Sequence, residues 1–351
     1  MAERILTLRE LNRALLARQL LLERARLSPA RAIERVGALQ AQWSPAPYVA
    51  LWTRLEDFSI PQLERALARK SAVKATLMRS TLHLVSSADY PVFAAAIVDA
   101  RRAKVERLFP LDLDVIAKRL REATTEPPQS WDAWRELMIS LAGRPIKPGE
   151  IWPLWTVAFM HARLVHLPPS GTYSFYRGAH FVPYEEWVGA APDVPLEPMR
   201  HLLRRYLAAF GPATIDDMAS WMGVPTPAVR AVLDVAPRTF RDEAGRLLYD
   251  VPRAPLPASD TPAPVRLLPK WDSSLLAYSP PERARLLPDP YRKRVIAPNG
   301  DVAQTVLVDG FVAGTWKVEK KRLRVEPFAR LPRAVREELT TEEERLLAFL
   351  P

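Results

Sequence analysis

The segment RHLLRRYLAAFGPATIDDMASWMGVPTPAVRAVLD, residues 200–234, decides the fold class predicted for this chain. Thr214 is placed to cap a helix that begins with IDDMASWM. Gly223 and Pro225 then separate this helix from the next one, which is the usual punctuation of a helix-turn-helix. The stretch FRDEAGRLLYDV follows, and it has the pattern of a two-stranded wing. Residues 198–251 are therefore predicted to form a winged helix.

The first hundred residues have the same order of helices followed by a hairpin. Thr7 and Glu10 form a capping box at the start of an amphipathic helix that continues to about Arg24. Further helices are expected over residues 28–42, 48–55 and 59–70. The stretch AVKATLMRSTLHLVS, residues 72–86, has β-branched and apolar residues around a polar Arg79-Ser80 tip, which indicates a short hairpin. This unit is a second predicted winged helix.

The remaining sequence completes the predicted architecture. Residues 152–183 have the pattern helix, strand, Gly-containing turn, strand, which suggests a third winged unit. Residues 251–269 hold six prolines and little apolar periodicity, so they are expected to be a stiff connector. Strand patterns follow, with Asp309-Gly310 closing a type I′ hairpin, and an acidic, leucine-bearing helix occupies residues 333–350.

The fold class expected is α+β, with tandem winged-helix units followed by a small β-barrel-like domain. The predicted domains are winged helix 1 over residues 1–110, winged helix 2 over 111–195, winged helix 3 over 196–252, the Pro-rich connector over 253–269, and the β-barrel-like domain with its C-terminal helix over 270–351.

The composition is that of a soluble globular protein. The chain has 351 residues, of which 48% are hydrophobic and 26% charged, so it is long enough for two or three cores. It has no apolar run of membrane-spanning length, and its amino terminus is charged where a signal peptide is apolar. We therefore expect a cytoplasmic, nucleoid-associated monomer with no membrane contact.

The chain contains no cysteine. This excludes disulfides, thiolate zinc sites, cysteine-ligated iron–sulfur clusters and cysteine nucleophiles. His161 and His166 are five residues apart and the other three histidines are scattered, so no metal-ligand spacing is present. We expect neither a metal nor a cofactor.

Charge favours a polyanionic partner. The net charge is +10 and the pI is near 9.9. Residues 270–324 hold 11 Lys or Arg against 6 Asp or Glu, with clusters at 292–294 and 320–322. Two alternatives stay open: the excess charge reflects the composition of an arginine-, alanine- and proline-rich chain, and each cluster is a solvated loop.

The stretch LQAQWSPAPYVALW, residues 39–52, is the candidate for chemistry. Ser28 and Pro29 begin a helix that is expected to end near Gln42, because Pro45 and Pro47 disfavour helical backbone before them. Gln40 and Gln42 would then lie at an unwinding helix end, where they could share a pocket. In the alternative, one glutamine caps loose carbonyls and the other lies in solvent.

Four motifs in order give the chain a resemblance to the AlkZ-like winged-helix DNA glycosylases. They are LQAQWSPAPYVALWTRL, LMRSTLHLV, LLPKWDSSLLAY and NGDVAQTVLVDGFVAGTWKV. The first resembles the Gln-x-Gln segment of that family, whose YcaQ-type relatives carry Gln-x-Asp there. The resemblance covers nearly the whole chain. It implies a concave DNA-binding surface and hydrolytic release of alkylated purines from double-stranded DNA, including cross-linking or bulky adducts.

The resemblance also implies site residues. Gln40 and Gln42 match the catalytic pair, and Arg79 and His83 match an Arg-x-x-Leu-His pattern. A buried histidine bonded to backbone is the alternative for His83. The residues expected to contact DNA are Trp43, Arg79, His83, Arg292, Lys293, Arg294 and Lys317.

Two glutamine amides can catalyse base release only when the base is already activated as a leaving group. An N7-alkylated guanine already carries positive charge, so it leaves without protonation. A glutamine carbonyl can then orient a water against C1′ while its NH₂ group holds a phosphate or sugar oxygen. The alternative function is a winged-helix transcriptional regulator that binds DNA without catalysis. A nuclease is disfavoured because no carboxylate metal cluster is present.

Overall fold

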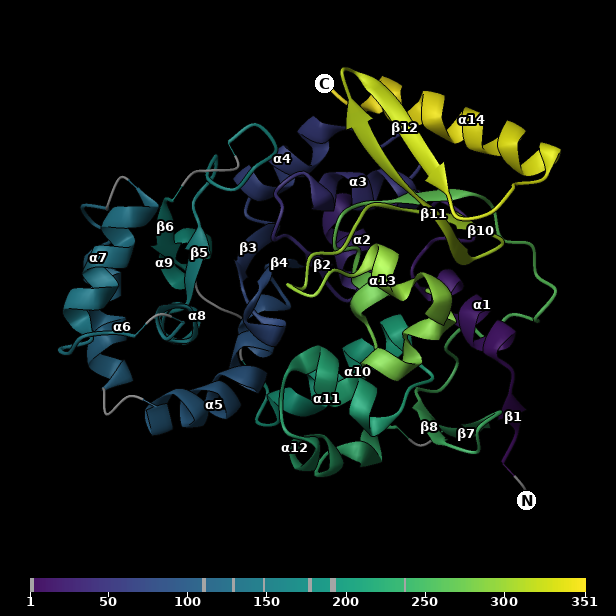
Figure 1. The fold of residues 1–351 in the computed structure, drawn as a ribbon. Helices are drawn as coiled ribbons and strands as arrows, with labels where there is room; N and C mark the ends of the chain where they lie inside the picture. The colour runs from purple at the N-terminus through teal and green to yellow at the C-terminus, as the bar shows by residue number, and fades with distance from the viewer. Residues whose placement is uncertain are drawn as a thin grey trace.

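The computed structural model describes residues 3–108, 112–127, 130–147, 149–175, 179–189, 194–236 and 238–351. Within these residues the strands form three sheets, with helices between and around them (Figure 1). Within the described residues, none of the helices is long and apolar enough to span a bilayer.

The amino-terminal segment follows the predicted order. Its helices are α1 (Leu8–Arg18), α2 (Pro29–Val36), α3 (Ala46–Arg54) and α4 (Ile60–Ala68), and its hairpin consists of β3 (Ala72–Thr76) and β4 (Leu82–Ser86). Thr7 and Glu10 form the expected capping box on α1, and Ser28 caps α2 with Pro29 in its first turn. Helix α1 ends earlier than expected, because Leu20 has a left-handed backbone (φ 57°) soon after it.

The predicted position of the two glutamines at a helix end is wrong. Helix α2 ends at Val36, because Gly37 adopts φ 89°, a conformation that favours glycine. A Cβ on Gly37 would lie 3.1 Å from Cβ of Ala209, so α10 also approaches the chain closely here. The chain then enters strand β2 (Leu39–Gln40).

Strand β2 is the edge of a five-stranded sheet with the order β2-β4-β3-β5-β6. Strands β5 (Leu164–His166) and β6 (Phe181–Pro183) come from the second predicted unit and continue the sheet of the first. Helices form the left side of Figure 1: α5 (Tyr90–Leu108) ends the first predicted unit, and the second contains α6 (Leu113–Glu122), α7 (Trp131–Leu141), α8 (Ile151–His161) and α9 (Tyr184–Val188). The domain boundary at 110/111 stays a prediction, and one sheet crosses it.

The segment that decided the predicted fold class has the expected elements. They are α10 (Pro198–Phe210), α11 (Ile215–Met222), α12 (Thr226–Arg230), the short helix η2 (Leu233–Val235), β7 (Arg238–Asp242) and β8 (Leu247–Asp250). Thr214 caps α11, and Gly223 ends it with φ 69°. Strand β1 (Ile5–Leu6) adds to β7 in parallel. The assignment of three tandem winged helices remains a prediction.

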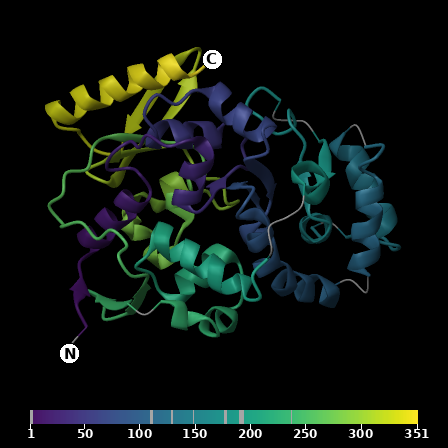
Figure 2. The same cartoon turned by 180° about the vertical axis from the view of Figure 1, so that it is seen from behind.

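The carboxy-terminal sheet is open, so the prediction of a β-barrel-like domain is wrong. Its order is β12-β11-β10-β9, and its edge strands β9 and β12 are not paired with each other. The strands are β9 (Arg266–Leu268), β10 (Thr305–Val308), β11 (Phe311–Glu319) and β12 (Arg322–Pro327). Helix α14 (Arg333–Phe349) packs against both edge strands in place of closure (Figure 2).

Short helices connect β9 to β10 on the other side of this sheet. They are η3 (Ser273–Leu276), η4 (Pro280–Arg285), η5 (Asp289–Tyr291) and α13 (Arg292–Val295). Strand β9 takes up the last residues of the predicted connector, so the extended segment is shorter than expected. The predicted type I′ turn is confirmed, with φ 47° at Asp309 and 82° at Gly310 between β10 and β11.

Candidate active site

Gln40 lies in strand β2 and pairs in register with His83 of β4. Its side chain is 6% exposed. Its Oε1 accepts a hydrogen bond of 2.9 Å from Nη2 of Arg79, a residue of the short helix η1 (Met78–Ser80) at the tip of the β3–β4 hairpin. The hairpin tip therefore fixes the first amide.

Gln42 follows the strand and is partly exposed. Its Oε1 accepts a hydrogen bond of 3.1 Å from the backbone N–H of Leu82, at the start of β4. The backbone N–H of Ala41 donates to the carbonyl of Leu82 at 2.8 Å, so the chain stays extended between the two glutamines. Residues i and i+2 of an extended chain share a face, whereas residues i and i+2 of a regular helix point in different directions.

The orientation of both amides follows from their partners. A guanidinium and a backbone N–H can only donate, so the atom that faces them must be the carbonyl oxygen. Gln40 and Gln42 thus direct their carbonyls at the β3–β4 hairpin and keep their NH₂ groups as donors. Each carbonyl oxygen retains a second lone pair for a water molecule. The pair can therefore orient a water and donate to an oxygen of a substrate.

Arg79 is the charged group of the site. Its backbone is left-handed (φ 53°), and its Nη1 donates to the carbonyl of Trp221 at 2.9 Å. Burial, together with the neighbouring charges of Arg283 and Arg101, lowers the pKa of Arg79 to about 10. The guanidinium is therefore charged at neutral pH, and within the described residues it has no carboxylate partner.

His83 fits the alternative given in the sequence analysis, a buried histidine bonded to backbone. It is 1% exposed, and its Nδ1 lies 2.9 Å from the carbonyl of Thr81. Because a carbonyl only accepts, Nδ1 carries the proton and Nε2 is the acceptor. Burial, followed by the charge of Arg79, lowers the pKa of His83 to about 3. The ring is neutral at physiological pH and presents almost no surface to DNA.

The motif LLPKWDSSLLAY, the third of the four that carry the family resemblance, forms hydrogen bonds with the segment that contains Gln40. The backbone N–H of Gln40 donates to Oγ of Ser273 at 3.1 Å, and this hydroxyl donates to the carbonyl of Ala38 at 3.0 Å. The preceding residue, Asp272, forms a fully buried ion pair with Arg54 of α3 at 2.9 Å. Sequence reasoning assigned no role to Ser273, because a serine beside an aspartate is unremarkable without the fold.

Lys74 is a residue near the site that the sequence did not single out. It is 5% exposed, and its Nζ donates to Oγ of Ser44 at 2.8 Å and to the carbonyl of Gly171 at 3.2 Å. Burial lowers its pKa to about 7. Lys74 pairs with Leu84, whereas Gln40 pairs with His83, so their side chains lie on opposite faces of the sheet.

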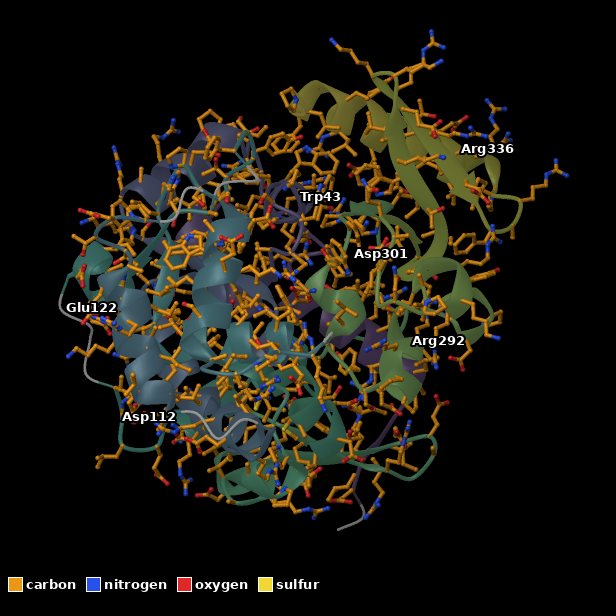
Figure 3. The ribbon with its side chains drawn as sticks, turned by 60° about the vertical axis from the view of Figure 1, so that its left-hand side comes forward. Trp43, Asp112, Glu122, Arg292, Asp301 and Arg336 are labelled. Carbon is orange, nitrogen blue, oxygen red and sulfur yellow. The ribbon has the colours of Figure 1, made fainter. Side chains whose placement is uncertain are left out.

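The remaining predicted DNA contacts are spread over the surface. Trp43 is partly exposed beside Gln42, and Arg292 lies apart from it in Figure 3. Lys293 is exposed, whereas Arg294 pairs with Glu326 and Lys317 pairs with Glu319. Arg292 itself pairs with Asp289. The structure therefore brings Gln40, Gln42, Arg79 and His83 together and leaves the C-terminal cations elsewhere.

A polar pocket of about 390 Å³ lies on the C-terminal sheet near these cations. It is lined in part by Lys270, Arg294, Lys317, Asp301 and Glu326. Across the described residues, no group of three or more histidine, aspartate or glutamate side chains is placed to hold a metal ion.

Comparison with known proteins gives three findings. The sequence model of the family described as "DNA glycosylase AlkZ-like" matches residues 33–349. A protein of Streptomyces sahachiroi named "Interstrand DNA cross-link repair glycosylase" is 29% identical over 150 residues, which are 41% of this chain and 40% of that protein. The solved structure of Streptomyces sahachiroi DNA glycosylase AlkZ has a TM-score of 0.79 at 21% identity, covering 98% of this chain and 97% of that one. The last finding shows a shared fold.

Proposed function

Because this chain belongs to the AlkZ-like DNA glycosylase family, we propose that it hydrolyses the N-glycosidic bond of N-alkylated purines in double-stranded DNA. The substrates would be N7-alkylguanines, including bulky and cross-linking adducts, in DNA repair or in self-resistance. The relative named for interstrand cross-link repair supports this substrate class, although its match spans 40% of that protein. The protein would act as a monofunctional enzyme and as a monomer, without metal or cofactor.

The reaction needs little from the protein, because the base is already a good leaving group. The bond between C1′ and N9 breaks, and its electron pair neutralises the positive charge of the alkylated purine. A water oxygen bonds to C1′, and its proton goes to solvent. The protein must place that water and tolerate an oxocarbenium-like sugar, which is a task of positioning rather than of acid catalysis.

The fixed orientation of the two amides carries the proposal. Gln40 and Gln42 each offer a carbonyl lone pair to a water and an NH₂ group to a phosphate or sugar oxygen, and donors from the protein hold both carbonyls in place. His83 is neutral and buried, so it supplies no strong base or acid. This arrangement favours substrates whose leaving group is cationic.

The monofunctional mechanism gives a first prediction. Borohydride treatment during turnover should trap no protein–DNA adduct, because the buried Lys74 is bonded to Ser44 and Gly171 on the face opposite Gln40. The measurement is gel analysis of labelled duplex carrying N7-methylguanine, with a bifunctional glycosylase as the positive control. A trapped adduct that disappears in Lys74→Met would show that the mechanism includes a Schiff base.

The function itself is tested by base release. Purified protein is incubated with duplexes that carry one N7-methylguanine or one N7-guanine cross-link, and free adducted base and abasic sites are measured by chromatography. Release from both duplexes is expected. Release from the methyl adduct alone would confine the proposal to small adducts and point to a closed pocket that must extrude the base.

The alternative of a catalytically silent regulator has less support. The family that the chain belongs to is one of DNA glycosylases. A regulator would bind one operator tightly, whereas a glycosylase of this kind should bind undamaged sequences weakly, with an affinity that falls steeply with salt. Selection from random duplexes distinguishes the two.

A further inference from the structure

A small pocket lies beside the hairpin tip, outside the amide pair. Its volume is about 160 Å³, and it is bounded by η1, α5 and α8. One side is polar and consists of Arg79, Ser80 and Arg101. The other side is formed by side chains of α5 and α8 that are mostly apolar, namely Val105, Trp152, Pro153, Thr156 and Val157.

Arg101 is held in place at the polar side. Its Nη1 donates to Oγ of Ser80 at 2.8 Å. A Cβ on Gly223, which ends α11 with φ 69°, would lie 1.9 Å from Nη2 of Arg101. The guanidinium therefore lies against the Cα of a glycine, whose positive φ itself favours glycine at this position.

The polar side carries charge without compensation. Within the described residues, neither Arg79 nor Arg101 has a carboxylate within salt-bridge distance, and the buried Nε of Arg101 has no hydrogen-bond partner. Burial also lowers the pKa of Arg101 from its ordinary value. Two cations that face one pocket are stabilised when an anion enters it.

The opposite side is suited to a nucleotide. Trp152 is 50% exposed, although tryptophan usually buries most of its surface. An exposed aromatic ring beside unpaired arginines is the arrangement with which proteins hold a nucleotide, since a base or sugar packs on the ring and a phosphate meets the cations. The volume admits a phosphodiester group but not a duplex segment.

We propose that this pocket holds one DNA phosphate next to the reacting nucleotide, with Arg101 as its main ligand and Trp152 against the attached sugar or base. The proposal rests on the proposed function. Arg79 links the two places, because it faces the pocket and also donates to Gln40. A phosphate seated at Arg101 would therefore set the position of the sugar relative to the amide that Arg79 holds.

The test measures binding alone, so that it does not depend on base release. The probe is a fluorescent duplex with a tetrahydrofuran abasic analogue, in which single phosphates on either side of the analogue are replaced by neutral methylphosphonates. Affinities are measured for the parent, for Arg101→Met and for the matched control Arg102→Met. Arg102 is the next residue of α5 but already pairs with Glu106 and Asp114.

One methylphosphonate position should weaken binding by the parent and by Arg102→Met about tenfold. The same position should have no effect on Arg101→Met, which should bind the unmodified duplex about tenfold more weakly and lose about one unit of the slope of log affinity against log salt. Trp152→Ala should still bind more weakly when that phosphate is replaced, and it should bind every duplex of the series more weakly than the parent does. Thermal unfolding checks that the variants fold.

Equal responses of the parent and Arg101→Met at every position would overturn the proposal. Inorganic phosphate could instead stabilise the parent against thermal unfolding but not Arg101→Met, while the two proteins respond alike to every methylphosphonate. That result would also overturn the proposal and assign the pocket to a free phosphate. Failure of the parent to release base would contradict the proposed function and leave this binding result unaffected.

Discussion

At the residue scale, the main contact of the candidate site is the hydrogen bond from the Arg79 guanidinium to the side-chain amide of Gln40. Arg79 donates to Oε1 of Gln40 and to the carbonyl of Trp221, and we propose that its guanidinium positions the amide rather than touching the reacting atoms. The sequence identified both residues through motif resemblance. It could not show that they bond to each other, because 39 positions separate them and only the hairpin brings them together.

The bond between these two residues gives a prediction. Arg79→Met should lower the single-turnover rate of base release by roughly 10- to 100-fold, because the amide of Gln40 loses its fixed direction. In a Gln40→Ala background the same substitution should have little further effect. The measurement is a double-mutant cycle on an N7-methylguanine duplex at saturating protein. Additive losses would mean that Arg79 acts independently of Gln40.

At the scale of elements, capping and turn chemistry were the most readable features of the sequence. The capping box at Thr7, the glycine after α11 and the Asp309-Gly310 turn all lie where they were expected. The start of α2 was also predicted, but its end was not. The prolines after Gln42 were expected to end the helix, whereas Gly37 ends it earlier with its positive φ, beside Ala209 of α10.

The Asp309-Gly310 turn gives a prediction because it packs on another element. A Cβ on Gly310 would lie 2.5 Å from Oδ1 of Asn12 and 2.7 Å from Cδ1 of Leu16, both in α1. Gly310→Ala should therefore cost the strain of a left-handed alanine, about 1 kcal/mol, plus roughly 1–3 kcal/mol for overpacking. The measurement is the free energy of unfolding in urea.

Gly300→Ala is the matched control for this turn. Gly300 has the same φ of 82°, but a Cβ there would have no atom within 4 Å. It should lose only the backbone cost of about 1 kcal/mol. Equal losses in the two variants would show that the packing of the turn against α1 contributes nothing.

At the scale of the whole molecule, the sequence predicted which elements exist better than how they associate. Strands from two predicted units share one sheet, and the C-terminal strands stay open under α14. Strand patterns report alternation along the chain, but the partner of an edge strand is set by distant segments. The same limit hid Lys74, whose burial depends on Ser44 and Gly171 from two other segments.

Lys74 predicts how stability depends on pH. Its folded pKa is about 7, against an ordinary value of 10.5, so between these values the unfolded chain holds a proton on this amine that the folded protein lacks. The free energy of unfolding should therefore rise with pH across that window, by about 1.4 kcal/mol per pH unit. The neighbouring His166, whose pKa burial lowers well below its ordinary value, is neutral throughout.

The measurement is the free energy of unfolding at several pH values for the parent and Lys74→Met. The parent should gain roughly 3 kcal/mol relative to the variant between about pH 7 and pH 10. Titration of other groups is common to both proteins and cancels in the comparison. A difference that does not change with pH would show that Lys74 is charged when folded.

We propose that the two fixed amides drive the release of alkylated bases, and single-turnover base release by Gln42→Ala tests this role. The parent, Gln40→Ala and Gln42→Ala are compared on one N7-methylguanine duplex, with affinity measured in parallel on a tetrahydrofuran duplex. Gln42→Ala should slow release by roughly 100-fold or more, Gln40→Ala by less, and both should bind within a few fold of the parent. Release by Gln42→Ala at the rate of the parent would contradict the account.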